Sequence, residues 1–351
     1  MKVVCLRLVV QVPCLNEEQT LPLVLESIPE RIPGIDEIVT LVIDDGSTDR
    51  TVEVAKAHGV RHFVRHARNQ GLGRAFHDGV QRALELGADI VVNTDGDNQY
   101  PQDRIPDLVR PIVEGKADIV IADRQVHLVA HFSRLKILLQ RIGSRIVNLA
   151  AGTDVPDAAS GFRAYSRESL MQLNTITRFS YCMETIIQAG NKKLEIDSIP
   201  VVTNGKTRES RLFTSLGQHV RMSAGAIIRA YIMYKPYVIF TWLAAFFGIL
   251  GLVPFIRWAS LQVVDTHPSG HLQSLLIGVV LLIMSFLSVI IGIISDLIRT
   301  NRTLIEDTLE HTKKMRFGVG ERPPARSELL PDPIDIGWDQ ASPDVPVAAK
   351  R

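Results

Sequence analysis

Two carboxylates separated by one glycine, Asp95-Gly96-Asp97, directly follow an apolar run at residues 90–93. Hard oxygen ligands of this kind suit Mg²⁺ or Mn²⁺ bound to a diphosphate. Taken alone, Asp-Gly-Asp is also a common acidic turn. The metal hypothesis therefore depends on the other polar groups in the chain.

A second polar group, Asp44-Asp45-Gly46-Ser47-Thr48-Asp49, follows the apolar run 38–43. It has the composition of a turn in which Ser47 or Thr48 caps the next helix. A functional interpretation instead places Asp45 or Asp44 against the base or ribose of a nucleotide. A third group, Pro13-Cys14-Leu15-Asn16-Glu17-Glu18, follows the apolar run 8–12.

The elements that position these groups alternate along the chain. Apolar, β-branched runs at 8–12, 38–43, 90–93 and 119–122 alternate with helical patterns at 17–28, 48–58 and 71–86. This alternation predicts an α/β fold with a mostly parallel, Rossmann-like sheet covered by helices. Ligands of such sheets bind beyond the carboxyl ends of the strands, where all three polar groups fall.

The order and spacing of these motifs, together with Asn69-Gln70-Gly71 and Asn98-Gln99-Tyr100-Pro101, resemble family 2 glycosyltransferases with the GT-A fold. Within that family the chain is similar to polyprenyl-phosphate sugar synthases such as dolichyl-phosphate mannose or glucose synthase. The resemblance covers approximately residues 8 to 235. It implies transfer of a sugar from a UDP- or GDP-linked donor to a polyprenyl phosphate, and the sequence leaves the sugar and the nucleotide open.

The resemblance also implies roles for particular residues. It assigns the nucleotide sugar to Pro13, Asn16, Glu17, Asp44, Asp45, Gly71, Asp95, Gly96 and Gln99. It assigns Mg²⁺ or Mn²⁺ to Asp95, Asp97 and Gln99. The implied catalytic residues are Asp97, Asp157 and Arg163, and the implied phosphate and acceptor ligands are Arg124, Arg208, Ser210 and Arg211.

Two segments depart from the family pattern. Ala122-Asp123-Arg124 stands where relatives usually have Gly-Ser-Arg, which leaves the shape of this loop open. Arg208-Glu209-Ser210-Arg211 stands where relatives often have Gly-Glu-Ser-Lys. Arginine keeps the positive charge of lysine but offers a planar fork of donors, so we expect phosphate binding to be retained.

The implied reaction needs no strong general base, because a polyprenyl phosphate is already an anion near neutral pH. Its oxygen can attack the anomeric carbon directly while the metal and the arginines neutralise the departing nucleoside diphosphate. Direct displacement predicts inversion at that carbon. An α-linked donor would give a β-linked lipid product.

Residues 236–256 and 273–295 contain no charged residue, and each would form a helix of about 30 Å, close to the hydrocarbon thickness of a bilayer. Buried core helices are the alternative interpretation. Arginine and lysine flank the pair on its outer sides, whereas the connecting loop contains one, Arg257. The positive-inside rule therefore predicts a multi-pass protein of the cell membrane, or of the endoplasmic reticulum membrane in a eukaryote, with a cytoplasmic catalytic domain.

The predicted organisation has four parts: a GT-A domain at 1–210, a juxtamembrane amphipathic helix at 211–235, a two-helix transmembrane hairpin at 236–298, and a cytoplasmic tail at 299–351 that is disordered after about 318. Residues 127–150 and 212–234 mix apolar and basic residues, which is typical of helices on a membrane surface. The alternative is a core-facing helix with a solvated basic side.

Composition limits the other classes. A net charge of +1 gives no general field for nucleic acid, and the three separated cysteines indicate reduced thiols. A polysaccharide synthase would need a translocation pore and usually Gln-x-x-Arg-Trp, which none of the three tryptophans completes. A catalytically silent membrane scaffold and, more weakly, a nicotinamide oxidoreductase are the remaining alternatives.

Glycines in the spans, such as Gly251 and Gly278, would allow close helix contacts and a homo-oligomer.

Overall fold

The computed structural model describes residues 6–125, 134–175, 181–205, 236–264 and 272–317. The chain divides into two compact units, one formed by residues 1–222 with 310–351 and the other by residues 223–309. Each unit is considered separately below.

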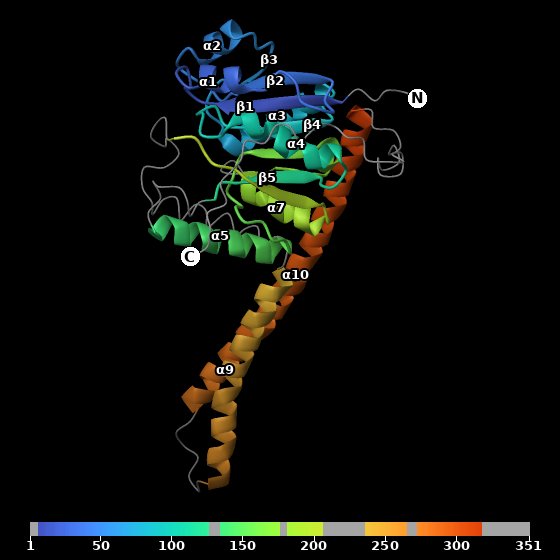
Figure 1. The fold of residues 1–351 in the computed structure, drawn as a ribbon. Coiled ribbons are helices and arrows are strands. Elements are labelled where there is room, and N and C mark those ends of the chain that lie inside the picture. Colours follow the sequence, from blue (N-terminus) through green and yellow to red (C-terminus); the bar gives the residue numbers. More distant parts are fainter. Residues whose placement is uncertain (1–5, 126–133, 176–180, 206–235, 265–271, 318–351) are drawn as a thin grey trace. The chain divides into compact units, whose positions relative to one another are not determined.

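The first unit is built on a seven-stranded sheet with the order β3-β2-β1-β4-β6-β5-β7 (Figure 1). Its strands are β1 Arg7–Cys14, β2 Glu37–Asp44, β3 His62–Arg65, β4 Ile90–Asn93, β5 Ile119–Asp123, β6 Arg163–Ser166 and β7 Ile196–Pro200. All paired neighbours are parallel except β6, which runs antiparallel to β4 and β5. The predicted mostly parallel α/β sheet is confirmed, and the reversed strand is a feature that the sequence analysis did not include.

The register of the strands gathers the predicted site at one edge of the sheet. Cys14 pairs with Asp44, so β1 and β2 end level with each other. Asn93, the last residue of β4, pairs with Arg163, the first residue of the antiparallel β6. The segment that precedes β6 therefore lies at the same edge as the loops that follow β1, β2 and β4.

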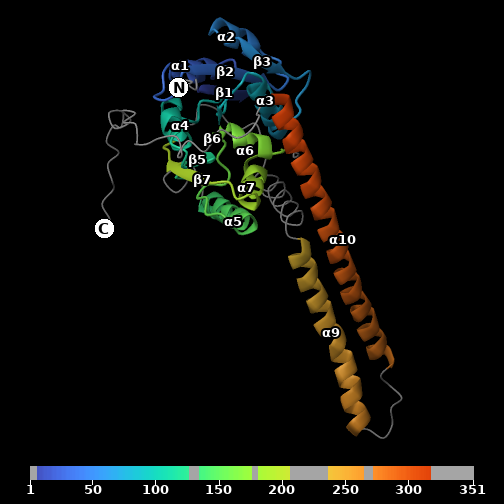
Figure 2. The same cartoon turned by 90° about the vertical axis from the view of Figure 1, so that its right-hand side faces the viewer.

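Helices cover both faces of the sheet (Figures 1 and 2). Alternate residues of β1 pack with α1 Leu21–Ser27, α2 Thr51–Ala57 and α4 Ile105–Val113, which follows the short η1 Gln102–Arg104. The opposite face packs against α3 Leu72–Glu85, whose Phe76 stacks on Tyr181 of α7 Tyr181–Asn191. The helix α5 Arg134–Ala151 packs in turn on α7, and α6 Arg167–Gln172 follows β6.

The last residues of α10 Leu272–Phe317 also belong to the first unit. Lys313 donates to the carbonyl oxygens of Leu173 (2.7 Å) and Leu170 (3.4 Å) at the end of α6. Arg316 forms an ion pair with Glu85 at 2.7 Å. Residues 299–317 continue α10 without a break, whereas the sequence predicted that they belong to the tail.

The second unit pairs α9 Pro236–Val264 with the apolar part of α10. Small residues lie between the helices: a Cβ on Gly278 would come within 3.1 Å of the Gly251 carbonyl oxygen, and Ser285 donates to Ala244 O at 2.7 Å. The most apolar windows of α9 and α10 are only 11% and 17% buried, unlike core helices of a soluble domain. Both helices are long and apolar enough to cross a membrane.

Candidate functional site

Carboxylates surround the end of β1. Burial raises the pKa of the Cys14 thiol well above its ordinary value, and the nearby charges of Glu17, Asp44 and Asp95 raise it further. These three acids were predicted from separate motifs, so their common effect on Cys14 shows that the fold brings the motifs together. A concentration of negative charge at the carboxyl ends of parallel strands favours a cation there.

The loops after β1 and β2 are fastened to each other. Asn16 has a φ of +57°, a conformation that asparagine tolerates, and its Oδ1 accepts a hydrogen bond from Thr48 N at 2.7 Å. Its own N donates to Ser47 Oγ at 2.9 Å. Ser47 and Thr48 thus bind the neighbouring loop, contrary to the prediction that one of them caps α2. At the start of α2, Asp49 Oδ1 instead accepts from Thr51 N at 3.0 Å.

Asp45 organises a third loop. Its carboxylate accepts hydrogen bonds from Gln70 N and Gly71 N, both at 2.9 Å, and lies 2.7 Å from His66 Nδ1. These bonds place the predicted nucleotide residues Asp45 and Gly71 side by side. His66 was missed, because a histidine without metal-ligand spacing gives no signal in the sequence.

The Asp95-Gly96-Asp97 turn lies directly beyond β4. A Cβ on Gly96 would come within 2.9 Å of Cys14 Sγ, which packs this turn against the end of β1. Asp97 Oδ1 accepts from Gln99 N at 3.1 Å, so the structure involves the backbone of Gln99, and the predicted metal contact of its side chain stays a prediction.

The donor set is compatible with a divalent cation that also binds a diphosphate. Among the described residues no group of three or more His, Cys, Asp or Glu side chains forms a complete metal site. Asp95 and Asp97 would supply two hard oxygen ligands on one turn, and phosphate oxygens would suit the remaining positions. The pKa of Cys14, which the charges of Glu17, Asp44 and Asp95 help to raise, also fits a cation at this edge of the sheet.

Arg124 and Asp157 form an ion pair on the other side of β4. Arg124 Nε donates to Asp157 Oδ2 at 2.6 Å and Nη2 donates to Oδ1 at 3.0 Å. Burial alone would raise the pKa of Asp157, but Arg124 and a hydrogen bond from Gln140 lower it below its ordinary value. The pair thus joins the predicted phosphate residue to a predicted catalytic residue.

Arg163 does not have the exposure that a catalytic role requires. Its side chain is completely buried, and its guanidinium donates to Ser160 O, Ala158 O, Cys182 O and Thr185 Oγ1 at 2.7 to 3.0 Å. All three of its nitrogens therefore bind the protein. The predicted contact with reacting groups is corrected to a structural role, in which Arg163 holds the segment before β6.

That segment lies against the Asp95-Gly96-Asp97 turn. A Cβ on Gly161 would come within 3.4 Å of Asp95 Oδ2, and Gly161 N donates to Tyr100 Oη at 2.9 Å. Asn93 Nδ2 donates to Gly161 O at 3.0 Å. Asn93 and Tyr100 are thus supporting residues that the sequence analysis did not name, since their partner lies more than sixty residues away in the chain.

Three comparisons identify the family. Residues 9–173 match the model of glycosyl transferase family 2. The dolichyl-phosphate hexose transferase of Haloferax volcanii is 30% identical over 197 residues, which cover 56% of this chain and 82% of the relative. The UDP-N-acetylglucosamine–dolichyl-phosphate N-acetylglucosaminyltransferase of Methanococcus voltae is 29% identical over 215 residues, 55% of this chain and 83% of the relative. The chain belongs to glycosyltransferase family 2.

The fold comparison agrees. A crystal structure of the glucosyl-3-phosphoglycerate synthase of Mycobacterium tuberculosis, with Mn²⁺, UDP-glucose and phosphoglyceric acid, is similar with a TM-score of 0.50 and 27% identity. The match covers 64% of this chain and 78% of that one. The protein is therefore a glycosyltransferase enzyme with the GT-A fold.

The remaining predicted ligands of this glycosyltransferase, Arg208, Ser210 and Arg211, lie outside the described residues. The chain that leads to them is described as far as residue 205. Asn204 N donates to Gln99 O at 2.9 Å, and its Nδ2 donates to Asn98 O at 3.1 Å. Asn204 therefore lies beside the residues that follow the Asp95–Asp97 turn.

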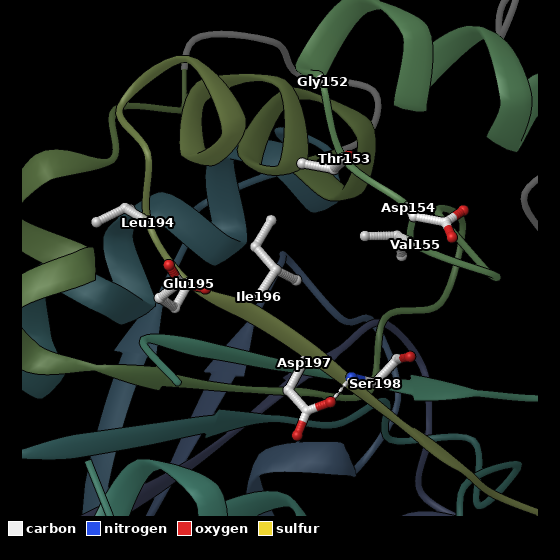
Figure 3. A pocket seen from close by; sticks show the side chains of 9 residues that line it. All are labelled: Gly152, Thr153, Asp154, Val155, Leu194, Glu195, Ile196, Asp197 and Ser198. Atoms are coloured by element: carbon white, nitrogen blue, oxygen red, sulfur yellow. Dashed lines mark hydrogen bonds between the residues drawn. The ribbon is translucent and has the colours of Figure 1, made fainter. Parts of the chain in front are cut away.

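A cavity of about 270 Å³ lies away from this edge (Figure 3). It is lined by residues 152–155, after α5, and by residues 194–198 at the start of β7. β7 runs parallel to β5, so its first residues lie at the opposite end of the sheet from Arg124. None of the predicted site residues lines this cavity, and we assign it no part in the site.

Proposed function

We propose that this glycosyltransferase transfers one sugar from a nucleoside-diphosphate sugar to a polyprenyl phosphate, with inversion at the anomeric carbon. The observation that carries the proposal is the meeting of two acidic turns, at Asp44-Asp45 and Asp95–Asp97, with the Arg124–Asp157 pair at one edge of the sheet. The printed names of the Haloferax and Methanococcus relatives supply the acceptor class.

The donor side of the proposed site comprises the loops after β1, β2 and β4. Asp95 and Asp97 would hold Mg²⁺ or Mn²⁺, and the cation would neutralise the diphosphate as it leaves. Asp44, Asp45, Asn16 and Glu17 would form the nucleotide end. The Mycobacterium relative, whose crystal contains Mn²⁺ and UDP-glucose, supports this arrangement, and we leave uridine and guanosine as alternative bases.

The acceptor side of the proposed site is basic. Asp157 engages Nε and Nη2 of Arg124, whereas Nη1 bonds to none of the described residues and could contact an acceptor phosphate. Asn204 is fixed beside Asn98, and a chain of four further residues reaches at most about 14 Å. The length of the chain therefore permits Arg208 to approach the phosphates that we place at Asp95–Asp97, which is compatible with its proposed role with Ser210 and Arg211.

In the proposed reaction an oxygen of the acceptor phosphate attacks the anomeric carbon as the bond from that carbon to the donor diphosphate breaks. The bonding electrons leave on the diphosphate oxygen, so no proton must be removed first. Asp157 is 2% exposed and already paired, so we assign it the positioning of Arg124 and no role as a base. The protein contributes alignment and charge, which together supply most of such a rate enhancement.

The acceptor's lipid tail would stay in the membrane. We propose that α9 and α10 span it, and that α5 lies on its surface. Leu138, Ile142, Ile146 and Leu149 form an exposed apolar stripe on α5, flanked by the exposed Arg141 and Arg145. The other side of α5 is buried through Ser144 and Val147. An exposed apolar stripe between cationic residues suits an anionic lipid surface.

A transfer assay tests the proposal. Detergent-purified protein is given UDP- and GDP-sugars with undecaprenyl or dolichyl phosphate, with Mg²⁺, Mn²⁺ or EDTA. A lipid-linked monosaccharide that is lost with EDTA is the expected product. Transfer only to phosphoglyceric acid would replace the lipid acceptor with the small acceptor of the Mycobacterium relative. A product with several sugars would indicate a polymerase, and no turnover with any pair would indicate a silent scaffold.

A further inference from the structure

His66 lies between two carboxylates. Its Nδ1 is 2.7 Å from Asp45 Oδ1 and its Nε2 is 3.1 Å from Asp78 Oδ2. Its side chain is 5% exposed, so water does not compete for either ring nitrogen. His66 follows β3, Asp45 follows β2 and Asp78 lies on α3, and thus one side chain joins three parts of the fold.

His66 and its partners form one connected network. Asp45 also accepts from Gln70 N and Gly71 N, and Asp78 also accepts from Arg74 Nε at 2.7 Å. Both ring nitrogens of His66 are therefore engaged by acids that also hold other parts of the fold.

The loop that Asp45 holds has little freedom to move elsewhere. Gly46 has a φ of +82°, and a Cβ there would come within 2.6 Å of Arg68 C. The turn after β2 and the segment 68–71 are therefore in backbone contact. Gly71, which begins α3 with a φ of +94°, is bound through its N to Asp45 Oδ2. The position of this loop thus depends on the Asp45 carboxylate and on the His66 ring that contacts it.

We propose that His66 is a positioning residue of the donor nucleotide site: its ring, held between Asp45 and Asp78, fixes the Asp45 carboxylate and, through it, the Gln70-Gly71 backbone. The inference rests on the proposed function, which places the nucleotide at Asp45. The other charges around the ring are those of Asp78 and Arg74 on α3. Arg65, next to it in the chain, is directed to Asp44, with Nε 3.6 Å from Oδ2.

The first experiment measures the dissociation constants of UDP and GDP with Mg²⁺ for the full-length protein in detergent. The wild-type protein should bind one of the two nucleotides. His66→Gln should bind it about tenfold more weakly, as expected for loss of a hydrogen bond that positions Asp45. The variant should raise the KM of the donor and leave that of the acceptor unchanged.

Two further variants isolate the effect. Asp78→Asn leaves Asp45 in place but weakens the contact on the other side of the His66 ring, so it should lower nucleotide affinity by less than His66→Gln does. His58→Gln is the matched control, because His58 also faces a carboxylate, Glu26 at 3.4 Å, but lies at the end of α2. It should bind nucleotide as the wild-type protein does.

The outcomes separate this inference from the proposed function. If the wild-type protein binds nucleotide and His66→Gln keeps its affinity, the role of His66 is wrong while the donor site stands. Equal losses in donor and acceptor KM, with a lower melting temperature, would likewise overturn it in favour of a purely structural role. If neither UDP nor GDP binds the wild-type protein, both ideas fail.

Discussion

Arg124 and Asp157 meet in a two-point ion pair, with Nε–Oδ2 and Nη2–Oδ1 distances of 2.6 and 3.0 Å, although 33 residues separate them in the chain. Gln140 of α5 adds a third bond, to Asp157 Oδ1 at 3.1 Å. The arginine at the end of β5 is thereby connected to the helix that carries the exposed apolar stripe. Asp157 is a residue whose removal should disturb the acceptor side first.

Asp157→Asn should lower acceptor affinity more than donor affinity. The amide cannot balance the charge of Arg124, and breaking a buried pair of this kind costs about 3 kcal/mol of stability. Steady-state kinetics with each substrate varied, together with a melting curve, would measure both effects. Asp154→Asn, an exposed acid three residues away, is the control. A loss of kcat alone, with both KM values and the melting temperature unchanged, would instead indicate that Asp157 acts in the chemical step.

Asp97→Ala should remove metal-dependent transfer while leaving the protein folded. Asp97 is only partly buried and lies on a turn, so its truncation should disturb the core little. Loss of one group that stabilises the leaving diphosphate should lower kcat by about 10² to 10³-fold. Asp103→Ala, an exposed acid on η1, controls for the removal of a nearby charge. Full activity of Asp97→Ala with unchanged sensitivity to EDTA would rule out Asp97 as a metal ligand.

Arg163→Met should reduce stability more than it reduces the chemistry of the surviving folded protein. The variant leaves four buried acceptors without their donor, and each unsatisfied buried group costs about 1 to 3 kcal/mol. Chemical denaturation would measure the loss, with Arg167→Met as a comparison at a partly exposed arginine. Wild-type stability combined with a large fall in kcat would restore the catalytic role that the sequence suggested.

The parallel part of the fold could be predicted because its strands are apolar runs that each end in a polar motif. The carboxyl ends of parallel strands lie at one edge of a sheet, so the motifs after β1, β2 and β4 were expected to lie together there. The short β6, Arg163-Ala164-Tyr165-Ser166, has no such pattern, and its direction is fixed by pairing with β4 and β5. Helix α1 starts at Leu21 and not at the predicted residue 17, with Pro22 in its first turn, where the missing N–H of proline costs no helical bond.

The side-chain pairs within the site were less predictable than its location. Asp45 was expected at the nucleotide, but its bonds to His66 and to the Gln70-Gly71 backbone join parts of the chain more than twenty residues apart. Arg163 was assigned to catalysis because of its motif, and burial decided otherwise. Motifs indicate which residues gather, whereas burial and pairing decide which of them can meet a ligand.

The buried Lys313 at the end of α10 should make stability depend on pH. Burial and the charge of Lys192 together lower its pKa to about 8, although the charge of Glu310 raises it. In the unfolded chain a lysine keeps a pKa of about 10.4, so between about pH 8 and pH 10 the unfolded state binds more protons. The free energy of unfolding should therefore gain up to about 1 kcal/mol per pH unit from this group as the pH rises through that window.

Lys313→Met removes that titration, so the variant should become less stable relative to the wild-type protein with each step from pH 8 to pH 10. Denaturant unfolding of the full chain in detergent at several pH values would measure the difference. Lys314→Met is the matched control, because Lys314 is 41% exposed and pairs with Glu310 at 2.7 Å. A difference between wild type and Lys313→Met that does not change with pH would mean that Lys313 is hydrated in solution, and that the end of α10 does not rest on the carbonyl oxygens of Leu170 and Leu173.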